Sequence, residues 1–164
     1  MKILLLSLLA CFVHLSAEAK ILEGIVSYVG DGDTVWIAVD RNTKPLKLRF
    51  LGLDAPEICQ AWGPQARDAL KAKLLKQTVT IDTKARDDYA RAVGRIAHRG
   101  EDVGAWLVKN GHAWSYGYQG RSAPYANEQA AAQNARLGLW AKGDAIEPRT
   151  FRKLNGACKR SKSF

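Results

Sequence analysis

The chain has 164 residues and a formal net charge of +9, from 25 Lys and Arg against 16 Asp and Glu. This length suits one domain of ordinary size. A hydrophobic content of 47% with 9% aromatic residues excludes a mostly disordered chain. The first apolar run, from Ile3 to Val13, falls short of the about 20 residues that a spanning helix needs, and no later stretch comes close to that length.

The N-terminus has the pattern of a signal peptide. Lys2 precedes the apolar run, and Ser16-Ala17-Glu18-Ala19 supplies the small residues that a signal peptidase reads. We expect residues 1–19 to be removed and the protein to be secreted or periplasmic. A second route stays open, because Leu8-Leu9-Ala10-Cys11 resembles a bacterial lipobox. Cys11 would then carry a lipid anchor in the envelope. A buried N-terminal helix is the third alternative.

Two cysteines remain after such processing, Cys59 and Cys158. An even pair in an oxidising compartment favours a disulfide between them, and two independent thiols are the alternative. The C-terminal segment, residues 149–164, holds six basic and no acidic residues. We interpret it as a basic tail that either attracts polyanions or is merely a solvated end.

The first half of the chain predicts strands. Leu22–Val29, Thr34–Val39 and Leu46–Leu51 are rich in alternating apolar residues. Short polar turns join them, the first of which is Gly30-Asp31-Gly32-Asp33, so the three strands form an antiparallel meander.

A helix then opens at Trp62-Gly63-Pro64, with Ala66, Leu70 and Leu74 on one face. The remaining predicted elements are, in order, the strands Thr78–Thr83 and Tyr89–Ala97 and the helices Val103–Lys109 and Pro124–Leu137. This order predicts an α+β fold, a five-stranded OB-type barrel with three helices in a domain of residues 20–148. A twisted open sheet is the alternative.

Four acidic residues fall at strand ends and turns, namely Asp31, Asp33, Asp54 and Glu57. Two oxygen-rich turns that face each other suit a hard cation such as Ca²⁺, although Asp-Gly is also an ordinary hairpin turn. Arg49 lies between Leu48 and Phe50 and should face away from the core. Beside these carboxylates it forms either a structural ion pair or a site for phosphodiester hydrolysis. In such a site a cation and a guanidinium neutralise the phosphate, and a carboxylate activates water.

Three separated motifs carry a resemblance to a known family. They are Gly30-Asp31-Gly32-Asp33-Thr34-Val35, Leu48-Arg49-Phe50-Leu51-Gly52-Leu53-Asp54-Ala55-Pro56-Glu57 and Asp88-Tyr89-Ala90-Arg91. Their order and spacing resemble the staphylococcal nuclease-like (thermonuclease) family over roughly Leu22 to Trp140. The resemblance implies an OB barrel with three helices. It also implies Ca²⁺-dependent cleavage of single-stranded or frayed DNA and of RNA at the 5′ oxygen, leaving 3′-phosphate ends.

The resemblance also assigns roles to residues. Asp33 and Asp54 would hold Ca²⁺ through their side chains, and Ala55 through its backbone carbonyl. Glu57 would be the general base. Arg49 and Arg91 would bind the scissile phosphate and stabilise the charge that grows in the transition state.

Two positions depart from the family pattern. Ala55 stands where Thr is common, which should leave a carbonyl ligand intact. Ala90 stands where Gly often precedes the second catalytic arginine, and a required positive φ would displace Arg91. Tyr116 and Tyr118 are candidates for substrate binding, with core packing as the alternative.

The main competing function is a non-catalytic OB module that binds single-stranded nucleic acid. A basic envelope-binding protein is a weaker alternative, suggested by the tail alone. The sequence lacks the motifs of zinc enzymes, nucleotide-driven motors and serine hydrolases. A monomer is the default expectation.

Overall fold

The computed structural model describes residues 21–117, 122–156 and 158. The predicted signal peptide at 1–19, the lipid-anchor candidate Cys11 and the substrate-binding candidate Tyr118 lie outside this part of the chain. Within it, no helix has both the length and the apolar character needed to cross a membrane.

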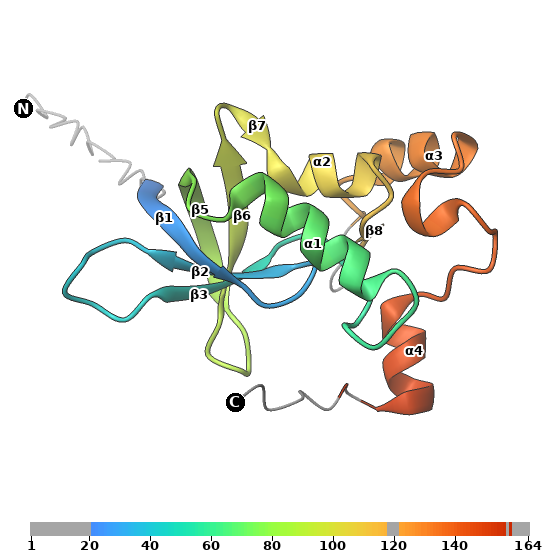
Figure 1. The fold of residues 1–164 in the computed structure, drawn as a ribbon, viewed down its shortest axis with the longest axis horizontal. Coiled ribbons are helices and arrows are strands. Elements are labelled where there is room, and N and C mark those ends of the chain that lie inside the picture. Colours follow the sequence, from blue (N-terminus) through green and yellow to red (C-terminus); the bar gives the residue numbers. More distant parts are fainter. Residues whose placement is uncertain (1–20, 118–121, 157, 159–164) are drawn as a thin grey trace, which may run out of the picture.

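Five strands form a closed barrel (Figure 1). The strands β1 (Ile21–Val29), β2 (Thr34–Ala38) and β3 (Leu46–Phe50) make the predicted antiparallel meander. The other edge of β1 pairs with β5 (Thr78–Arg86), which pairs in turn with β6 (Ala92–His98). The barrel closes because β6 also pairs in parallel with β3.

Short strands and helices complete the fold around this barrel. The strand β7 (Glu101–Asp102) extends the sheet beside β6, and β4 (Leu53–Asp54) pairs with β8 (Trp114–Ser115) in a separate small sheet. The helical elements are α1 (Gly63–Leu74), α2 (Val103–Lys109), α3 (Ala126–Asn134), the 3-10 helix η1 (Gly138–Trp140) and α4 (Pro148–Asn155).

Alternation of side chains along the strands builds the core. Val35 and Ile37 on β2 and Leu48 and Phe50 on β3 are buried inside the barrel, as period-two alternation requires. On α1 the predicted apolar face, Ala66, Leu70 and Leu74, is fully buried. The predicted meander and the predicted α1 face are therefore confirmed.

The closed OB-type barrel is confirmed, and the open-sheet alternative is wrong. Two local predictions also need correction. The strand predicted from Tyr89 begins only at Ala92, because residues 87–91 form a turn closed by hydrogen bonds between Asp87 and Arg91. A fourth helix, α4, occupies the start of the segment assigned to a basic tail.

The helix α4 has ordinary start and stop signals. Pro148 stands in its first turn, where its missing N–H costs nothing. Gly156 follows the last helical residue with a φ of 72° and ends the helix. In Figure 1, α4 lies below α3 at the right-hand side of the molecule.

A disulfide attaches this helix to the body of the protein. Cys59, in the loop before α1, is bonded to Cys158, directly after α4, across 99 residues of sequence. Their Cα atoms are 5.7 Å apart, inside the reach of about 7 Å that a bridge allows. The start of the predicted tail is thus a packed part of the domain.

Barrel closure leaves no room for a side chain at Gly94. This residue of β6 is paired with Thr83 of β5 on one side and with Phe50 of β3 on the other. A Cβ atom added here would approach the carbonyl oxygen of Asp82, which is backbone and cannot move independently.

We therefore expect Gly94→Ala to lower the free energy of unfolding by about 2 kcal/mol or more, because the strands must separate to admit the methyl group. Urea titration monitored by circular dichroism measures this. Glu23→Ala, at an exposed position of β1, is the control and should stay within about 0.5 kcal/mol of the parent. Equal stability of Gly94→Ala and the control would contradict this picture of barrel closure.

Candidate active site

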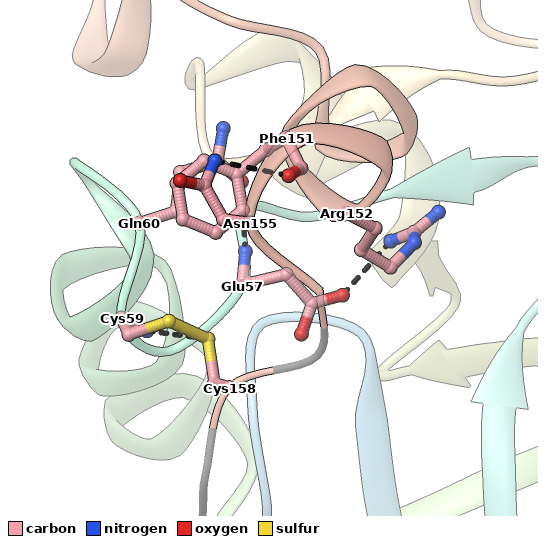
Figure 2. The surroundings of a disulfide bond; sticks show 7 residues. All are labelled: Glu57, Cys59, Gln60, Phe151, Arg152, Asn155 and Cys158. Carbon is pink, nitrogen blue, oxygen red and sulfur yellow. Dashed lines mark hydrogen bonds and ion pairs between the residues drawn. A yellow bond between two sulfur atoms is a disulfide. The ribbon is translucent and has the colours of Figure 1, made fainter.

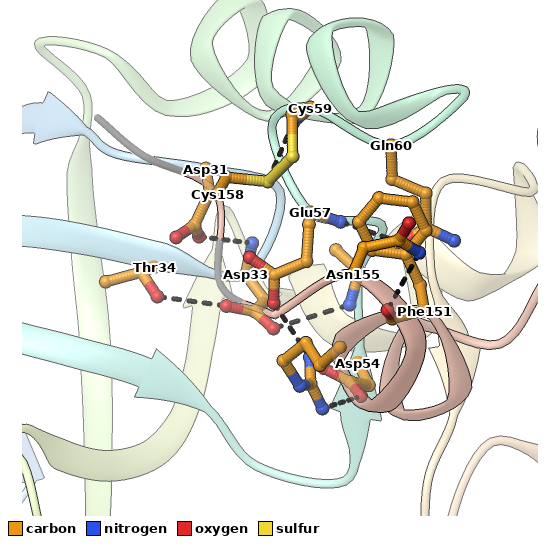
Figure 3. Close-up of polar contacts among 12 residues, drawn as sticks. Asp31, Asp33, Thr34, Asp54, Glu57, Cys59, Gln60, Phe151, Asn155 and Cys158 are labelled. Carbon is orange, nitrogen blue, oxygen red and sulfur yellow. Dashed lines mark hydrogen bonds and ion pairs between the residues drawn. A yellow bond between two sulfur atoms is a disulfide. The ribbon is translucent and has the colours of Figure 1, made fainter. Parts of the chain in front are cut away.

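Two buried carboxylates, one from the turn before β2 and one from β4, converge on one guanidinium. Nη2 of Arg49 lies 3.1 Å from Oδ2 of Asp33 and 2.7 Å from Oδ1 of Asp54. Asp33 is 4% exposed and Asp54 is 2% exposed. Figure 3 shows both side chains in one cluster with Asp31, Thr34 and Glu57. The structure thus brings together three of the residues that the sequence singled out.

Strand register explains this convergence. Thr34 of β2 is paired with Arg49 of β3, so Asp33, directly before β2, lies beside Arg49. The N–H of Phe50 donates to the carbonyl of Asp33 at 2.9 Å and fixes the turn. Because Leu48 and Phe50 face the core, Arg49 points to the opposite face, as predicted. Asp54 is held in place because β4 pairs with β8.

Burial and neighbouring charges shift the ionisation of two groups in this site. The charge of Asp33, with that of Asp54, raises the pKa of Arg49 above its usual range despite the opposing effect of burial. Burial and the nearby charge of Asp33 raise the pKa of the Asp31 carboxyl to about 7.

Glu57 is linked to this cluster through Arg152, a residue of α4. Nη1 of Arg152 donates to Oε1 of Glu57 at 2.9 Å, and Nη2 donates to Oδ2 of Asp54 at 2.8 Å. Figure 2 shows Arg152 reaching from α4 toward Glu57. Hydrogen bonding to Asp54, together with that to Glu57, raises the pKa of Arg152 above its usual range. The sequence placed Arg152 in the basic tail and gave it no role in the site.

Arg91 lies at the edge of the same cluster. Its Nη1 is 3.5 Å from Oγ1 of Thr34, whose hydroxyl donates to Oδ1 of Asp33 at 2.9 Å. Its Nε donates to Oδ2 of Asp87 at 2.7 Å. Arg91 is therefore linked to Asp33 through Thr34 rather than by direct contact.

The turn before Arg91 contains the alanine that departs from the family pattern. Ala90 has a φ of 58°, a left-handed conformation that costs a residue with a Cβ about 1–2 kcal/mol. Ala90 therefore adopts the positive φ despite its Cβ, and the guanidinium of Arg91 lies beside Thr34. Asp87 stabilises the turn, since its Oδ1 accepts the N–H groups of Tyr89 and Arg91.

The aromatic candidates differ in their surroundings. Tyr116 is half-buried, and its N–H donates to the carbonyl of Gly52 at 2.9 Å. Tyr89, which the sequence analysis did not select as a ligand, is 79% exposed, with the Cζ atom of Arg91 5.3 Å from the centre of its ring. An exposed ring beside a guanidinium at the edge of the site is available to a ligand.

The donor set around Asp33 and Asp54 fits a hard cation. Across residues 21–117, 122–156 and 158, no group of three or more His, Cys, Asp and Glu side chains is arranged to hold a metal. The candidate set consists instead of the carboxylates of Asp33 and Asp54, and the N–H of Ala55 donates to Oδ2 of Asp33 at 3.3 Å. Both carboxylates already face a single positively charged nitrogen of Arg49. All these candidate ligands are oxygens, the type that Ca²⁺ prefers.

Three residues that organise the site were not predicted from the sequence. Asp87 fixes the turn before Arg91, and Arg152 contacts Asp54 and Glu57. The buried Gln60 accepts the N–H of Glu57 at 3.1 Å and donates to the carbonyl of Ile146 at 2.6 Å. Glu147-Pro148 was an available start signal for a helix that carries Arg152. No sequence signal pointed to Gln60.

Comparisons with known proteins agree with this geometry. Residues 47–142 match the model of the family described as staphylococcal nuclease homologue. The chain is 33% identical over 153 residues to an uncharacterized endonuclease of Haemophilus influenzae, covering 93% of this chain and 85% of that protein. It is 34% identical over 156 residues to protein ParB of Escherichia coli, covering 88% and 87%. It is 33% identical over 144 residues to a micrococcal nuclease of Shigella flexneri, covering 81% and 82%.

The fold and the match define a nuclease of the OB-barrel class. The chain belongs to the staphylococcal nuclease family.

The ion pair between Asp87 and Arg91 makes stability depend on pH. Burial raises the pKa of Asp87, but hydrogen bonds from Arg91 and Tyr89 outweigh it, so the pKa lies below its ordinary value of 3.8. The charged form therefore contributes stability above about pH 4, and this contribution is lost as the pH falls through the folded-state pKa.

We expect Asp87→Asn to destabilise the protein by about 1–2 kcal/mol at pH 7 and by less at pH 3. Urea titrations of variant and parent at both pH values measure the two differences. Asp88→Asn, at an exposed position of the same turn, should change little at either pH. A loss for Asp87→Asn that is as large at pH 3 as at pH 7 would show that the carboxylate charge is irrelevant.

Proposed function

We propose that the protein is an exported, Ca²⁺-dependent nuclease that hydrolyses phosphodiester bonds of single-stranded or frayed DNA and of RNA. One observation carries this proposal, the convergence of the buried Asp33 and Asp54 on Arg49. Glu57 and Arg91 lie at the edges of that cluster. Membership in the nuclease family supports the reaction class.

Asp33 and Asp54 would hold the ion through their carboxylates, with the carbonyl of Ala55 as a backbone ligand. When bound, Ca²⁺ supplies positive charge that offsets the negative charge of the phosphate. Burial serves this role because a carboxylate removed from water gains more from a cation than an exposed one does.

Arg49 and Arg91 would bind the oxygens of the scissile phosphate. A planar guanidinium can donate two parallel hydrogen bonds to a phosphate. Arg49 contacts both carboxylates, and Arg91 is linked to Asp33 through Thr34. Their charges stabilise the negative charge that develops on the phosphoryl oxygens in the transition state.

Glu57 would act as the general base. It takes a proton from a water molecule, whose oxygen forms a bond to phosphorus. The bond from phosphorus to the 5′ oxygen then breaks, and this oxygen takes a proton from solvent water, which leaves a 3′-phosphate and a 5′-hydroxyl. The N–H of Glu57 donates to Gln60, so the backbone of the base is fixed in place.

Tyr89 is a candidate platform for a base of the substrate. Stacking of a base on an exposed ring contributes about 1–3 kcal/mol and requires that the base be free of its own helix. This requirement supports a preference for single-stranded or frayed ends. Tyr116 and Tyr118 stay candidates for further contacts, and the net charge of +9 favours polyanionic substrates.

Export is part of the proposal. The Cys59–Cys158 disulfide supports it, because disulfides persist in oxidising compartments. We propose a secreted or periplasmic monomer released by cleavage after Ala19, with lipid anchoring at Cys11 as the alternative.

A non-catalytic nucleic-acid-binding module is the competing function. The exposed Tyr89 and the basic charge would serve it equally well. Buried carboxylates at Asp33 and Asp54, with Glu57 beside them, would not, because they repel a phosphate backbone unless a cation intervenes. The acidic cluster therefore favours the enzyme.

Incubation of the mature protein with single-stranded DNA, in Ca²⁺ and separately in EDTA, tests the proposal. We expect fragments with 3′-phosphate ends in Ca²⁺ and intact DNA in EDTA, since the phosphate would lack its counter-ion. Equal cleavage in both tubes would reject the metal dependence. Retarded but uncleaved DNA in both would favour the binding module.

Replacement of the proposed base gives a second test. Glu57→Gln should lower turnover by about 10² or more, because an amide cannot accept the proton, while the thermal unfolding midpoint changes little. Glu23→Gln removes the same charge from an exposed position of β1 and should retain full turnover. A Glu57→Gln enzyme with parental turnover would remove Glu57 from the mechanism.

A further inference from the structure

The helix α4 is attached at both ends to one short turn, residues 57–60. Before the helix, the side chain of Gln60 donates to the carbonyl of Ile146 at 2.6 Å. After it, the disulfide joins Cys158 to Cys59. Figure 2 shows the disulfide and Gln60 on this turn together with Glu57, which Arg152 contacts from the middle of the helix. The position of α4 is therefore set by the segment that carries the proposed base.

Apolar packing contributes little to this placement. Pro148 is the one residue of α4 that is buried, and Phe151 and Arg152 are half-buried. Leu154 is 74% exposed. The main polar contact of the helix with the site is the guanidinium of Arg152, held between Asp54 and Glu57.

Two guanidinium groups donate hydrogen bonds to Asp54, one of the proposed metal ligands. Oδ1 of Asp54 accepts from Arg49 at 2.7 Å and from Arg152 at 3.2 Å, while Oδ2 accepts from Arg152 at 2.8 Å. A divalent cation that binds Asp54 competes with these donors for the carboxylate oxygens, and it repels the positive charge that remains beside it.

We propose that Arg152 is a tethered competitor of the divalent cation. Arg152 pairs with Asp54 and Glu57 and so inhibits the site until the cation displaces it. This inference rests on the proposed function. It adds to that function a regulatory element from α4, which lies beyond residues 47–142, the part of the chain that matches the family model.

Pairing with Arg152 affects both halves of the proposed mechanism. It occupies Asp54, a proposed metal ligand, and it holds Oε1 of Glu57, the proposed base. Displacement of Arg152 by the cation would free both groups in one step.

The tethers determine how strongly Arg152 competes. A group held beside its target by a short connection acts at a high effective concentration. If the paired state dominates, the apparent dissociation constant of the cation rises in inverse proportion to the fraction of free site. A paired state populated at about 90% weakens apparent binding about tenfold.

Calorimetric titration of the full mature chain with Ca²⁺ alone tests the proposal without reference to activity. We expect Arg152→Gln to lower the dissociation constant for Ca²⁺ about tenfold, because the competitor is gone. In EDTA the same variant should unfold at a lower temperature than the parent, since Asp54 and Glu57 lose their partner. Arg149→Gln is the matched control, because it makes the same substitution at an exposed position of the same helix. It should bind Ca²⁺ within about twofold of the parent.

The double variant C59S/C158S tests the tether. It should also bind Ca²⁺ more tightly than the parent, by a smaller factor than Arg152→Gln, because Gln60 still holds the start of α4. Combined with Arg152→Gln, the double variant should add no further change in affinity. Circular dichroism of each variant confirms that the barrel is folded.

Three results would overturn the inference. The first is a Ca²⁺ affinity of Arg152→Gln equal to that of Arg149→Gln. The second is a Ca²⁺ affinity of Arg152→Gln weaker than that of the parent. The third is no Ca²⁺ binding by the parent or by Arg152→Gln. In the first two cases Ca²⁺-dependent cleavage by the parent would still stand, so the proposed function would survive. If the parent fails to cleave DNA while Arg152→Gln binds Ca²⁺ more tightly, the proposed nuclease function is rejected. The proposal that Arg152 competes with the cation is then retained.

Discussion

The site depends on the burial of two carboxylates next to each other. Taking Asp33 and Asp54 out of water is costly unless positive charge accompanies them, and Arg49 supplies it from the neighbouring strand. The barrel makes this arrangement possible because β2 and β3 are paired in a register that sets Asp33 beside Arg49. Local strain is accepted at the edge of the cluster, where Ala90 keeps a left-handed conformation next to Arg91.

The same electrostatic requirement explains the C-terminal helix. The guanidinium of Arg49 contacts Oδ1 of Asp54 but leaves Oδ2 of Asp54 and the carboxylate of Glu57 without a cationic partner. Arg152 is the cationic partner of both. A helix with so little apolar burial needs covalent help to stay in place. A disulfide that closes a loop of about 100 residues stabilises a fold by about 2–5 kcal/mol. The counter-charge, the helix and the disulfide thus act as one unit on the turn of Glu57.

Short-range patterns made most of the fold and part of the site predictable. Alternation around Leu48 and Phe50 placed Arg49 on the outer face, and helical spacing placed Leu70 and Leu74 in the core. Ion pairs between distant segments left no comparable trace. Arg152 is 98 residues from Asp54, and its basic neighbours made the segment look like a solvated tail. The turn of Asp87 was hidden in a similar way, because a run of charged residues has no periodicity.

The most direct test of the central claim is a crystal structure of the mature protein grown with Ca²⁺. Our account predicts one ion bound by carboxylate oxygens of both Asp33 and Asp54 and by the carbonyl of Ala55, with Arg152 turned away from Asp54. An ion at another place, or Asp54 still paired with both Arg49 and Arg152 at saturating Ca²⁺, would contradict it.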